Sequence, residues 1–210
     1  MEGRLVLKNG AILEGDGRLR TAVAVLVVGG RIAQIDDDAR IPVLPGDWEV
    51  ACRGRLIAPG RVDAHAHLVG DLLPAVSEGE RERLACRLGA SEVEVLTALG
   101  LARAALAGAT LVCEHLRAPY CVGAALAAQQ RVAGTLRLRL VHSHACADAE
   151  GGRSALAQLE ESAAYASAVQ GDSRVRSALG CGRASLLSDE LMRETGRLSQ
   201  SLGVGVHFHA

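Results

Sequence analysis

The histidine pair His65 and His67 is the feature of this sequence that most directly suggests chemistry. Side chains alternate between the two faces of a β-strand, so two imidazoles separated by one residue point the same way. Two imidazoles on one face can hold a single divalent metal ion. A His-x-His pair is more often structural or solvated, but the Pro-Gly-x-x-Asp pattern at residues 59–63 favours a metal site here.

Other histidines fall near the ends of further predicted strands. His115 ends one strand, His142 and His144 end the next, and His207 and His209 lie in the last. Side chains at strand ends can face a common pocket, whereas the alternative for each histidine is a surface position or a hydrogen-bonded structural role. We therefore treat His115, His144 and His207 as candidate substrate-binding residues.

The residues from Pro59 onward are predicted to alternate strictly between strand and helix. The predicted strands cover residues 62–68, 110–115, 136–144, 174–181 and 203–209. The predicted helices cover residues 91–107, 121–132, 154–170 and 188–202. Strict alternation implies parallel strands. An open doubly wound sheet would satisfy this pattern, but we favour a TIM-type (β/α)8 barrel that is truncated after its fifth strand. His65 and His67 would then lie at the carboxyl end of the first barrel strand, where barrel active sites are built.

Residues 1–58 are predicted to form a small β-sheet. Its strands cover residues 4–8, 22–28, 31–35, 48–51 and 55–58. Asn9-Gly10 predicts a turn directly after the first of these strands. In the later part of the chain, Ser91 and Ser188 are predicted helix N-caps, and Glu94 completes a capping box with Ser91.

Composition limits the kind of partner and the compartment. The 210-residue chain is 49% hydrophobic and has a formal net charge of −1, which gives no reason to expect nucleic acid or a membrane as a partner. The longest apolar run, residues 22–28, is too short to span a bilayer, and the N-terminus lacks the order of a signal peptide. Six cysteines without a Cys-x-x-Cys pair predict free thiols in a reduced, cytoplasmic protein.

Several segments resemble the amidohydrolase superfamily of metal-dependent hydrolases. They are GRLIAPG at residues 54–60 followed by DAHAH at 63–67, GAT at 108–110, and GVGVHFHA at 203–210. Within the superfamily the chain looks most like the deaminase and chlorohydrolase branch, especially the SsnA-type aminohydrolases. The resemblance covers the N-terminal half of such proteins. It implies an α/β fold in which residues 1–58 are an incomplete β-sandwich portion and residues 59–210 are the first five strands of a metal-dependent hydrolase barrel.

The resemblance also assigns roles to particular residues. It implies that His65, His67 and His209 bind one divalent metal ion, since His207 lies two residues too early for the fifth-strand ligand. The general-base glutamate is expected at the second residue beyond Ala210, so no catalytic residue is expected within the chain. A sixth-strand histidine and an eighth-strand aspartate would also lie beyond it. Both Zn²⁺ and Fe²⁺ accept imidazole ligands, and Zn²⁺ is the expected ion.

Two positions of this chain differ from the patterns of related amidohydrolases. Dihydropyrimidinases, ureases and dihydroorotases bridge two metals with a carbamylated lysine on the fourth strand, but residues 174–181 contain no lysine. A single metal ion is therefore favoured, as in the deaminases. Gly182 stands where the deaminase branch usually carries a histidine, which indicates a different substrate or relaxed selection on the site.

Two functions remain open from the sequence. The first is a hydrolase of carbon–nitrogen bonds other than peptide bonds, an aminohydrolase or deaminase of a nitrogen heterocycle that uses metal-activated water. Its partner would be a small-molecule substrate, and a homo-oligomer is left open. The alternative is a non-catalytic truncated remnant or a half-barrel assembly partner, because a fifth strand at the edge of the sheet would be left unpaired. The intact strand and helix pattern favours the hydrolase.

Overall fold

The computed structural model describes residues 3–72, 77–85, 87–147, 154–183 and 187–209. The chain divides into two units, Met1–Pro59 and Gly60–Ala210. The first unit consists of strands and one short 3-10 helix, whereas the second alternates strands with helices. All seven histidines belong to the second unit, so the candidate site lies within one unit.

The first unit is a mixed five-stranded sheet centred on its first strand. Its elements are β1 (Arg4–Leu13), β2 (Leu19–Val28), β3 (Arg31–Asp37), η1 (Asp38–Arg40), β4 (Trp48–Ala51) and β5 (Leu56–Ile57). β1 pairs antiparallel with β2 and parallel with both β4 and β5, and β3 pairs with β2. Val6, Ala24 and Ile41 form a buried cluster against this sheet. The predicted small sheet is therefore confirmed.

The predicted turn at Asn9-Gly10 is wrong, because β1 continues through both residues. Asn9 has a φ of 56°, and the pairing with β2 shifts register at this point, which marks a β-bulge. The amide N–H of Asn9 donates to the carboxylate of Asp38 at 2.6 Å. A Cβ at Gly10 would lie 2.5 Å from Cδ1 of Ile57. Residue types that usually form a hairpin turn therefore form a bulge here, because distant residues pack against them.

The strands of the second unit form parallel pairs that follow the order of the sequence. They are β6 (Arg61–Ala66), β7 (Ala109–Leu116), β8 (Arg139–His144), β9 (Val175–Ser177), β10 (Leu179–Arg183) and β11 (Val206–His209). β6, β7, β8 and β9 pair in that order, β10 pairs with β11, and each pair is parallel. A parallel bridge between Cys146 and Cys181 joins the chain after β8 to β10. The predicted parallel arrangement is confirmed.

The predicted fourth strand, residues 174–181, is divided into β9 and β10. The break falls at Ala178, whose amide N–H donates to the carbonyl of His142 in β8 at 2.9 Å. The next amide, that of Leu179, donates to the carbonyl of Gly205 at 3.0 Å. A Cβ at Gly180 would lie 2.2 Å from the carbonyl oxygen of His144, so glycine permits this close approach.

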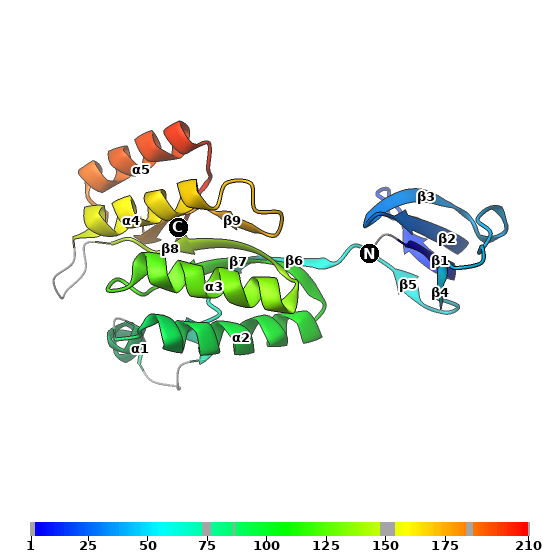
Figure 1. Ribbon diagram of the computed structural model, residues 1–210, viewed down its shortest axis with the longest axis horizontal. Coiled ribbons are helices and arrows are strands. Elements are labelled where there is room, and N and C mark those ends of the chain that lie inside the picture. Colours follow the sequence, from blue (N-terminus) through cyan, green and yellow to red (C-terminus); the bar gives the residue numbers. More distant parts are fainter. Residues whose placement is uncertain (1–2, 73–76, 86, 148–153, 184–186, 210) are drawn as a thin grey trace. The chain divides into compact units, whose positions relative to one another are not determined.

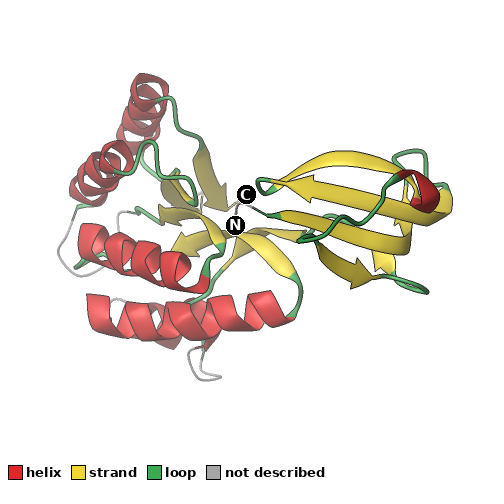
Figure 2. Ribbon diagram, turned by 45° about the vertical axis from the view of Figure 1, so that its right-hand side comes forward, coloured by secondary structure: helices red, strands yellow, loops and turns green. Residues whose placement is uncertain are grey.

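Helices cover one face of the parallel strands (Figure 2). They are α1 (Glu78–Ala85), α2 (Ala90–Leu106), α3 (Val122–Leu136), α4 (Ala155–Ala168) and α5 (Asp189–Leu202), and a 3-10 turn, η2 (Gly70–Leu72), precedes α1. Figure 1 shows α2, α3, α4 and α5 following one another along the sheet, and these are the four predicted helices. α1 falls in a segment without a predicted helix. In the described ranges, no helix is both long and apolar enough to cross a membrane.

Of the two predicted helix N-caps, the one of α5 is confirmed and the one of α2 is wrong. The hydroxyl of Ser188 accepts a hydrogen bond from the amide N–H three residues later at 3.2 Å, which confirms this N-cap. The predicted cap at Ser91 is wrong, because α2 begins earlier, after Gly89. The carboxylate of Glu92 accepts from the amide N–H of Gly89 at 3.1 Å, whereas Glu94 forms an ion pair with an arginine of α3.

Candidate metal centre

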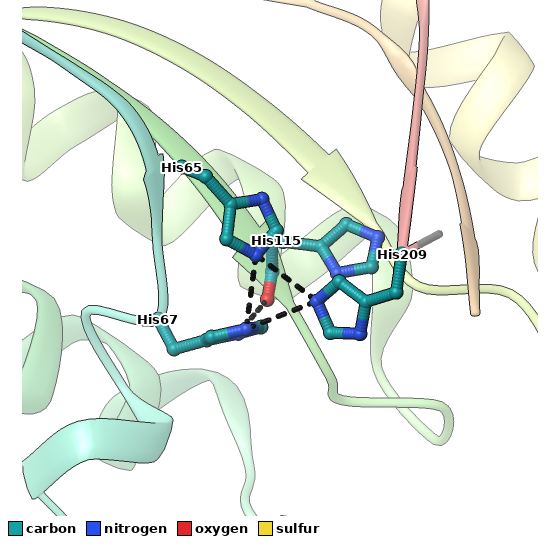
Figure 3. A group of neighbouring side chains, drawn as sticks. All are labelled: His65, His67, His115 and His209. Atoms are coloured by element: carbon teal, nitrogen blue, oxygen red, sulfur yellow. Dashed lines mark hydrogen bonds between the residues drawn. The ribbon is translucent and has the colours of Figure 1, made fainter. Parts of the chain in front are cut away.

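Three histidines bring their Nε2 atoms together in the second unit (Figure 3). The Nε2 atom of His65 lies 3.2 Å from that of His67 and 3.0 Å from that of His209. The Nε2 atoms of His67 and His209 are 3.1 Å apart. These nitrogens form a nearly equilateral triangle, although His209 is 144 residues from His65 in the sequence.

Strand periodicity places these side chains. His65 in β6 and His67 directly after it are two residues apart, so they point to the same side, and His207 and His209 do the same in β11. β6 and β11 are not paired with one another among the described strands. Side chains from two separate parallel sheets, β6 to β9 and β10 with β11, therefore meet at this point.

The triangle fits one tetrahedral metal ion. Zinc binds imidazole nitrogen at about 2.0–2.1 Å, which places neighbouring ligands of a tetrahedron about 3.3 Å apart. The separations of 3.0 to 3.2 Å are close to that value. Unprotonated nitrogens at this distance cannot hydrogen-bond to one another, so a shared cation suits all three.

The main chain holds the second ring nitrogen of His67. Its Nδ1 atom lies 3.0 Å from the carbonyl oxygen of His115. A carbonyl oxygen can only accept, so Nδ1 carries the proton and donates. A neutral His67 ring then presents the lone pair of Nε2 to the triangle. Metal-binding histidines usually have their second nitrogen in such a hydrogen bond.

The side chain of His115 lies beside the same triangle. It is 3% exposed, and one of its ring nitrogens lies within 4.8 Å of the ligand nitrogens of His65, His67 and His209. Its Nε2 atom is buried and has no hydrogen-bond partner among the described residues. Burial, and then the surrounding histidines, lower the pKa of His115 to about 3. The ring is therefore neutral near neutral pH.

His207 contacts the ring nitrogen of His65 that is not part of the triangle. Its Nε2 atom is 2.6 Å from Nδ1 of His65, and its Nδ1 atom is 3.2 Å from Oγ of Ser143. Burial first, and neighbouring histidines second, lower the pKa values of His207 and His209. Lowered pKa values favour neutral rings, which is the form that binds a metal ion or accepts a hydrogen bond.

His142 and His144 lie on the helix-facing side of β8. Ser143, between them, points toward His207, so strand alternation directs both of its neighbours to the other face. His144 is 0% exposed, and its Nε2 atom accepts a hydrogen bond from the amide N–H of Ala118 at 3.0 Å. The candidate substrate residue His144 therefore lies between sheet and helices, directed away from the triangle.

A buried glutamate, which the sequence analysis missed, supports the segment after His67. Glu114 in β7 is 0% exposed, and its Oε2 atom accepts a hydrogen bond from the amide N–H of Leu68 at 2.6 Å. Burial raises the pKa of Glu114 to about 8. Because Leu68 directly follows His67, this bond fixes the backbone beside a candidate ligand. The signal in the sequence is a charged residue inside an otherwise apolar strand.

Gly182 is close to the neighbouring chain segment. It lies in β10, and a Cβ at this position would be 3.1 Å from Cβ of Ala147. That distance is tighter than ordinary van der Waals contact, so a histidine here would require its neighbour to shift. Glycine at this position therefore matches the local packing as well as departing from the deaminase pattern.

Solved structures with a similar fold include two that contain zinc by their descriptions. An adenosine deaminase from Xanthomonas campestris with bound zinc gives a TM-score of 0.83 at 20% identity, over 98% of this chain and 49% of that chain. Atrazine chlorohydrolase from Arthrobacter aurescens complexed with zinc gives 0.83 at 15% identity, over 98% and 52%. Guanine deaminase from E. coli gives 0.76 at 17% identity, over 99% and 52%. The chain therefore spans about half the length of these proteins.

Curated relatives and a family model match parts of the sequence. An allantoinase from Enterococcus faecalis (strain ATCC 700802 / V583) is 38% identical over 68 residues, which is 32% of this chain and 13% of that protein. The protein LONG AFTER FAR-RED 3 from Arabidopsis thaliana is 32% identical over 79 residues, 37% of this chain and 14% of that protein. The model of the Amidohydrolase family matches residues 56–210, which include the entire histidine cluster. The chain belongs to the amidohydrolase family.

Proposed function

We propose that this chain functions in a metal-dependent hydrolase of carbon–nitrogen bonds other than peptide bonds, an aminohydrolase or deaminase of a nitrogen heterocycle. The observation that carries the proposal is the triangle of Nε2 atoms from His65, His67 and His209. Two deaminases and a chlorohydrolase among the similar structures support this substrate class.

His65, His67 and His209 are the proposed ligands of one divalent ion, Zn²⁺ rather than Fe²⁺. Two of the similar structures contain zinc, which supports this choice. The chemistry that such an ion supplies is the activation of water at neutral pH. The chain's own residues prepare for it: the His67 ring is oriented by a backbone carbonyl, and the His65 ring by His207.

The parallel strands are proposed to be the first five strands of a TIM-type barrel, with residues 1–58 as a β-sandwich portion. Sequential parallel order and the convergence of side chains from β6 and β11 support this arrangement. In the family pattern the general-base glutamate and the remaining metal ligands would lie beyond Ala210.

His115 is the proposed contact for substrate. One of its ring nitrogens lies within 4.8 Å of the ligand nitrogens of the triangle, where a substrate atom would approach the metal. His207 is occupied by hydrogen bonds to His65 and Ser143, so its proposed role is support rather than substrate contact. His144 faces the helices, so it is not proposed to bind substrate.

A small-molecule substrate is the proposed partner, and the proposed location is the cytoplasm. The described cysteines, Cys52, Cys113, Cys121, Cys146 and Cys181, are free thiols. Free thiols are typical of proteins in a reducing compartment. Sedimentation of the purified protein would show whether it forms a homo-oligomer.

The test of the proposal is metal content followed by activity. The full chain, stripped with a chelator and reloaded with Zn²⁺, is expected to retain one ion per chain through gel filtration, measured by mass spectrometry of the metal. Ammonia release from amino-substituted nitrogen heterocycles is then measured with protein isolated from its source. Failure to retain stoichiometric metal would overturn the proposal. Metal retention without hydrolysis of any heterocycle would favour the alternative of a non-catalytic assembly partner.

A further inference from the structure

We propose that Ser143 and His207 form a positioning relay that fixes the tautomer of His65 and thereby leaves its Nε2 atom unprotonated. The relay rests on the proposed metal site, because its purpose is to prepare one ligand of that site. Ser143 is 0% exposed, and the three side chains come from three different strands, β8, β11 and β6.

The direction of the relay is set at its first member. Oγ of Ser143 lies 3.0 Å from the carbonyl oxygen of Glu114 and 3.2 Å from Nδ1 of His207. A hydroxyl has one hydrogen, and a carbonyl oxygen can only accept. Ser143 therefore donates to Glu114, and its oxygen accepts a hydrogen bond from Nδ1–H of His207.

The position of the proton on His207 then decides which atom donates in its hydrogen bond with His65. A neutral imidazole with its proton on Nδ1 has an acceptor at Nε2. Nε2 of His207 lies 2.6 Å from Nδ1 of His65, so Nδ1–H of His65 is the donor in this contact. The neutral His65 ring then has a lone pair at Nε2, the atom that belongs to the triangle.

His67 reaches the same tautomer by a separate route, through its bond to the carbonyl oxygen of His115. Two Nε2 lone pairs, those of His65 and His67, therefore face each other at 3.2 Å. Lone pairs at this distance repel unless a proton or a cation lies between them. The relay therefore selects the ring form of His65 that a cation requires.

Hydrogen bonds to the second nitrogen of a metal-binding histidine fix its orientation and raise its basicity, and losing them typically weakens metal binding about 10- to 100-fold. The chain offers a matched control for Ser143. Oγ of Ser177 in β9 donates to the backbone carbonyl of His142 at 3.4 Å, the same kind of bond one strand further along. Ser177 is also buried, and it lies outside the histidine cluster.

The first measurement needs no variant and no metal. Long-range ¹H–¹⁵N NMR spectra of the metal-free full chain, labelled at its histidine nitrogens, distinguish the Nδ1–H from the Nε2–H tautomer. His65 is expected as the Nδ1–H tautomer. Finding the Nε2–H tautomer would overturn the relay, whether or not the protein binds zinc.

The second measurement compares Ser143→Ala with Ser177→Ala. Ser143→Ala is expected to give a mixture of His65 tautomers and to weaken zinc affinity about 10- to 100-fold in competition with a chelator. Ser177→Ala is expected to leave both unchanged. A Ser143→Ala protein with the wild-type tautomer, or with a zinc affinity equal to that of Ser177→Ala, would overturn the relay. If the wild-type chain binds no zinc, the proposed function fails, and the tautomer spectra still decide the relay.

Discussion

The Nδ1 atom of His67 donates a hydrogen bond to the backbone carbonyl of His115 at 3.0 Å, so the main chain of the neighbouring strand orients one candidate ligand. The position of that carbonyl follows from the pairing of β6 with β7, and no side-chain substitution removes it. His65 is instead supported by the side chain of His207. Because the two supports differ in kind, variants can separate the loss of a ligand from the loss of its orientation.

His67→Asn is expected to remove metal binding while keeping this hydrogen bond. The asparagine amide nitrogen can take the place of Nδ1 and donate to the carbonyl of His115, but nothing replaces Nε2. We expect zinc affinity to fall by more than about 100-fold, beyond the usual effect of losing only a supporting contact. Chelator competition measures the affinity, and thermal unfolding of the metal-free protein serves as the control for folding. Wild-type affinity in this variant would remove His67 from the ligand set.

His115→Gln is expected to keep the metal. The backbone carbonyl that orients His67 remains, and the proposed ligand triangle does not include the His115 side chain. X-ray absorption of the zinc-loaded variant should therefore show the same number of imidazole ligands as the wild-type protein. A spectrum with one imidazole fewer would instead identify His115 as a fourth ligand, which its place beside the triangle allows.

Residue type and two-residue spacing were sufficient to predict that His65 and His67 share a face, whereas only the resemblance to the amidohydrolase superfamily predicted that His209 joins them. The same spacing could not predict which face of β8 carries its histidines. His142 and His144 necessarily lie together, but the packing of helices against the sheet decides whether they face the centre or the helices, and this depends on distant contacts. Ser143 therefore reaches the site in place of its neighbours.

Short sequence patterns also failed to predict element boundaries where two alternatives were chemically equivalent. Glu92 and Glu94 follow Gly89 and Ser91 at the same spacing, so sequence alone could not choose between two starts for α2. Asn9 adopts the left-handed backbone conformation of a turn residue, but contacts with distant segments turn this into a bulge. The order and type of most elements were predictable because they depend on long patterns, whereas α1, the division of the fourth strand and single boundaries were not.

Gly100→Ala is expected to destabilise the protein near His67. Gly100 in α2 lies against the chain just after that histidine, and a Cβ would be 2.9 Å from the carbonyl oxygen of Leu68. Overpacking of this kind typically costs about 1–3 kcal/mol. Gly196→Ala in α5 is the control: its Cβ would meet nothing within 4 Å, so it should stabilise the helix by about 0.5–1 kcal/mol. Urea unfolding measures both, and a Gly100→Ala protein as stable as Gly196→Ala would show that α2 can shift.

The remaining prediction concerns the buried carboxyl of Glu114 and the pH dependence of folding. Burial raises the pKa of Glu114 to about 8, from 4.5 in an unfolded chain. Between these two pH values the unfolded chain has lost the proton, whereas the folded protein keeps it. The unfolded state therefore binds fewer protons, and stability must fall as pH rises.

Glu114→Gln should remove this pH dependence while preserving the contact with Leu68, because the amide oxygen can still accept from the Leu68 N–H. From pH 4.5 to about 8, the free energy of unfolding of the wild-type protein should fall relative to that of the variant. The slope should approach about 1.4 kcal/mol per pH unit if this carboxyl dominates. Urea unfolding of both proteins across this range, without metal, isolates the difference that Glu114 makes. Parallel stability curves would mean that the carboxyl ionises in the folded protein at its ordinary pKa, and that the Leu68 amide accommodates the charge.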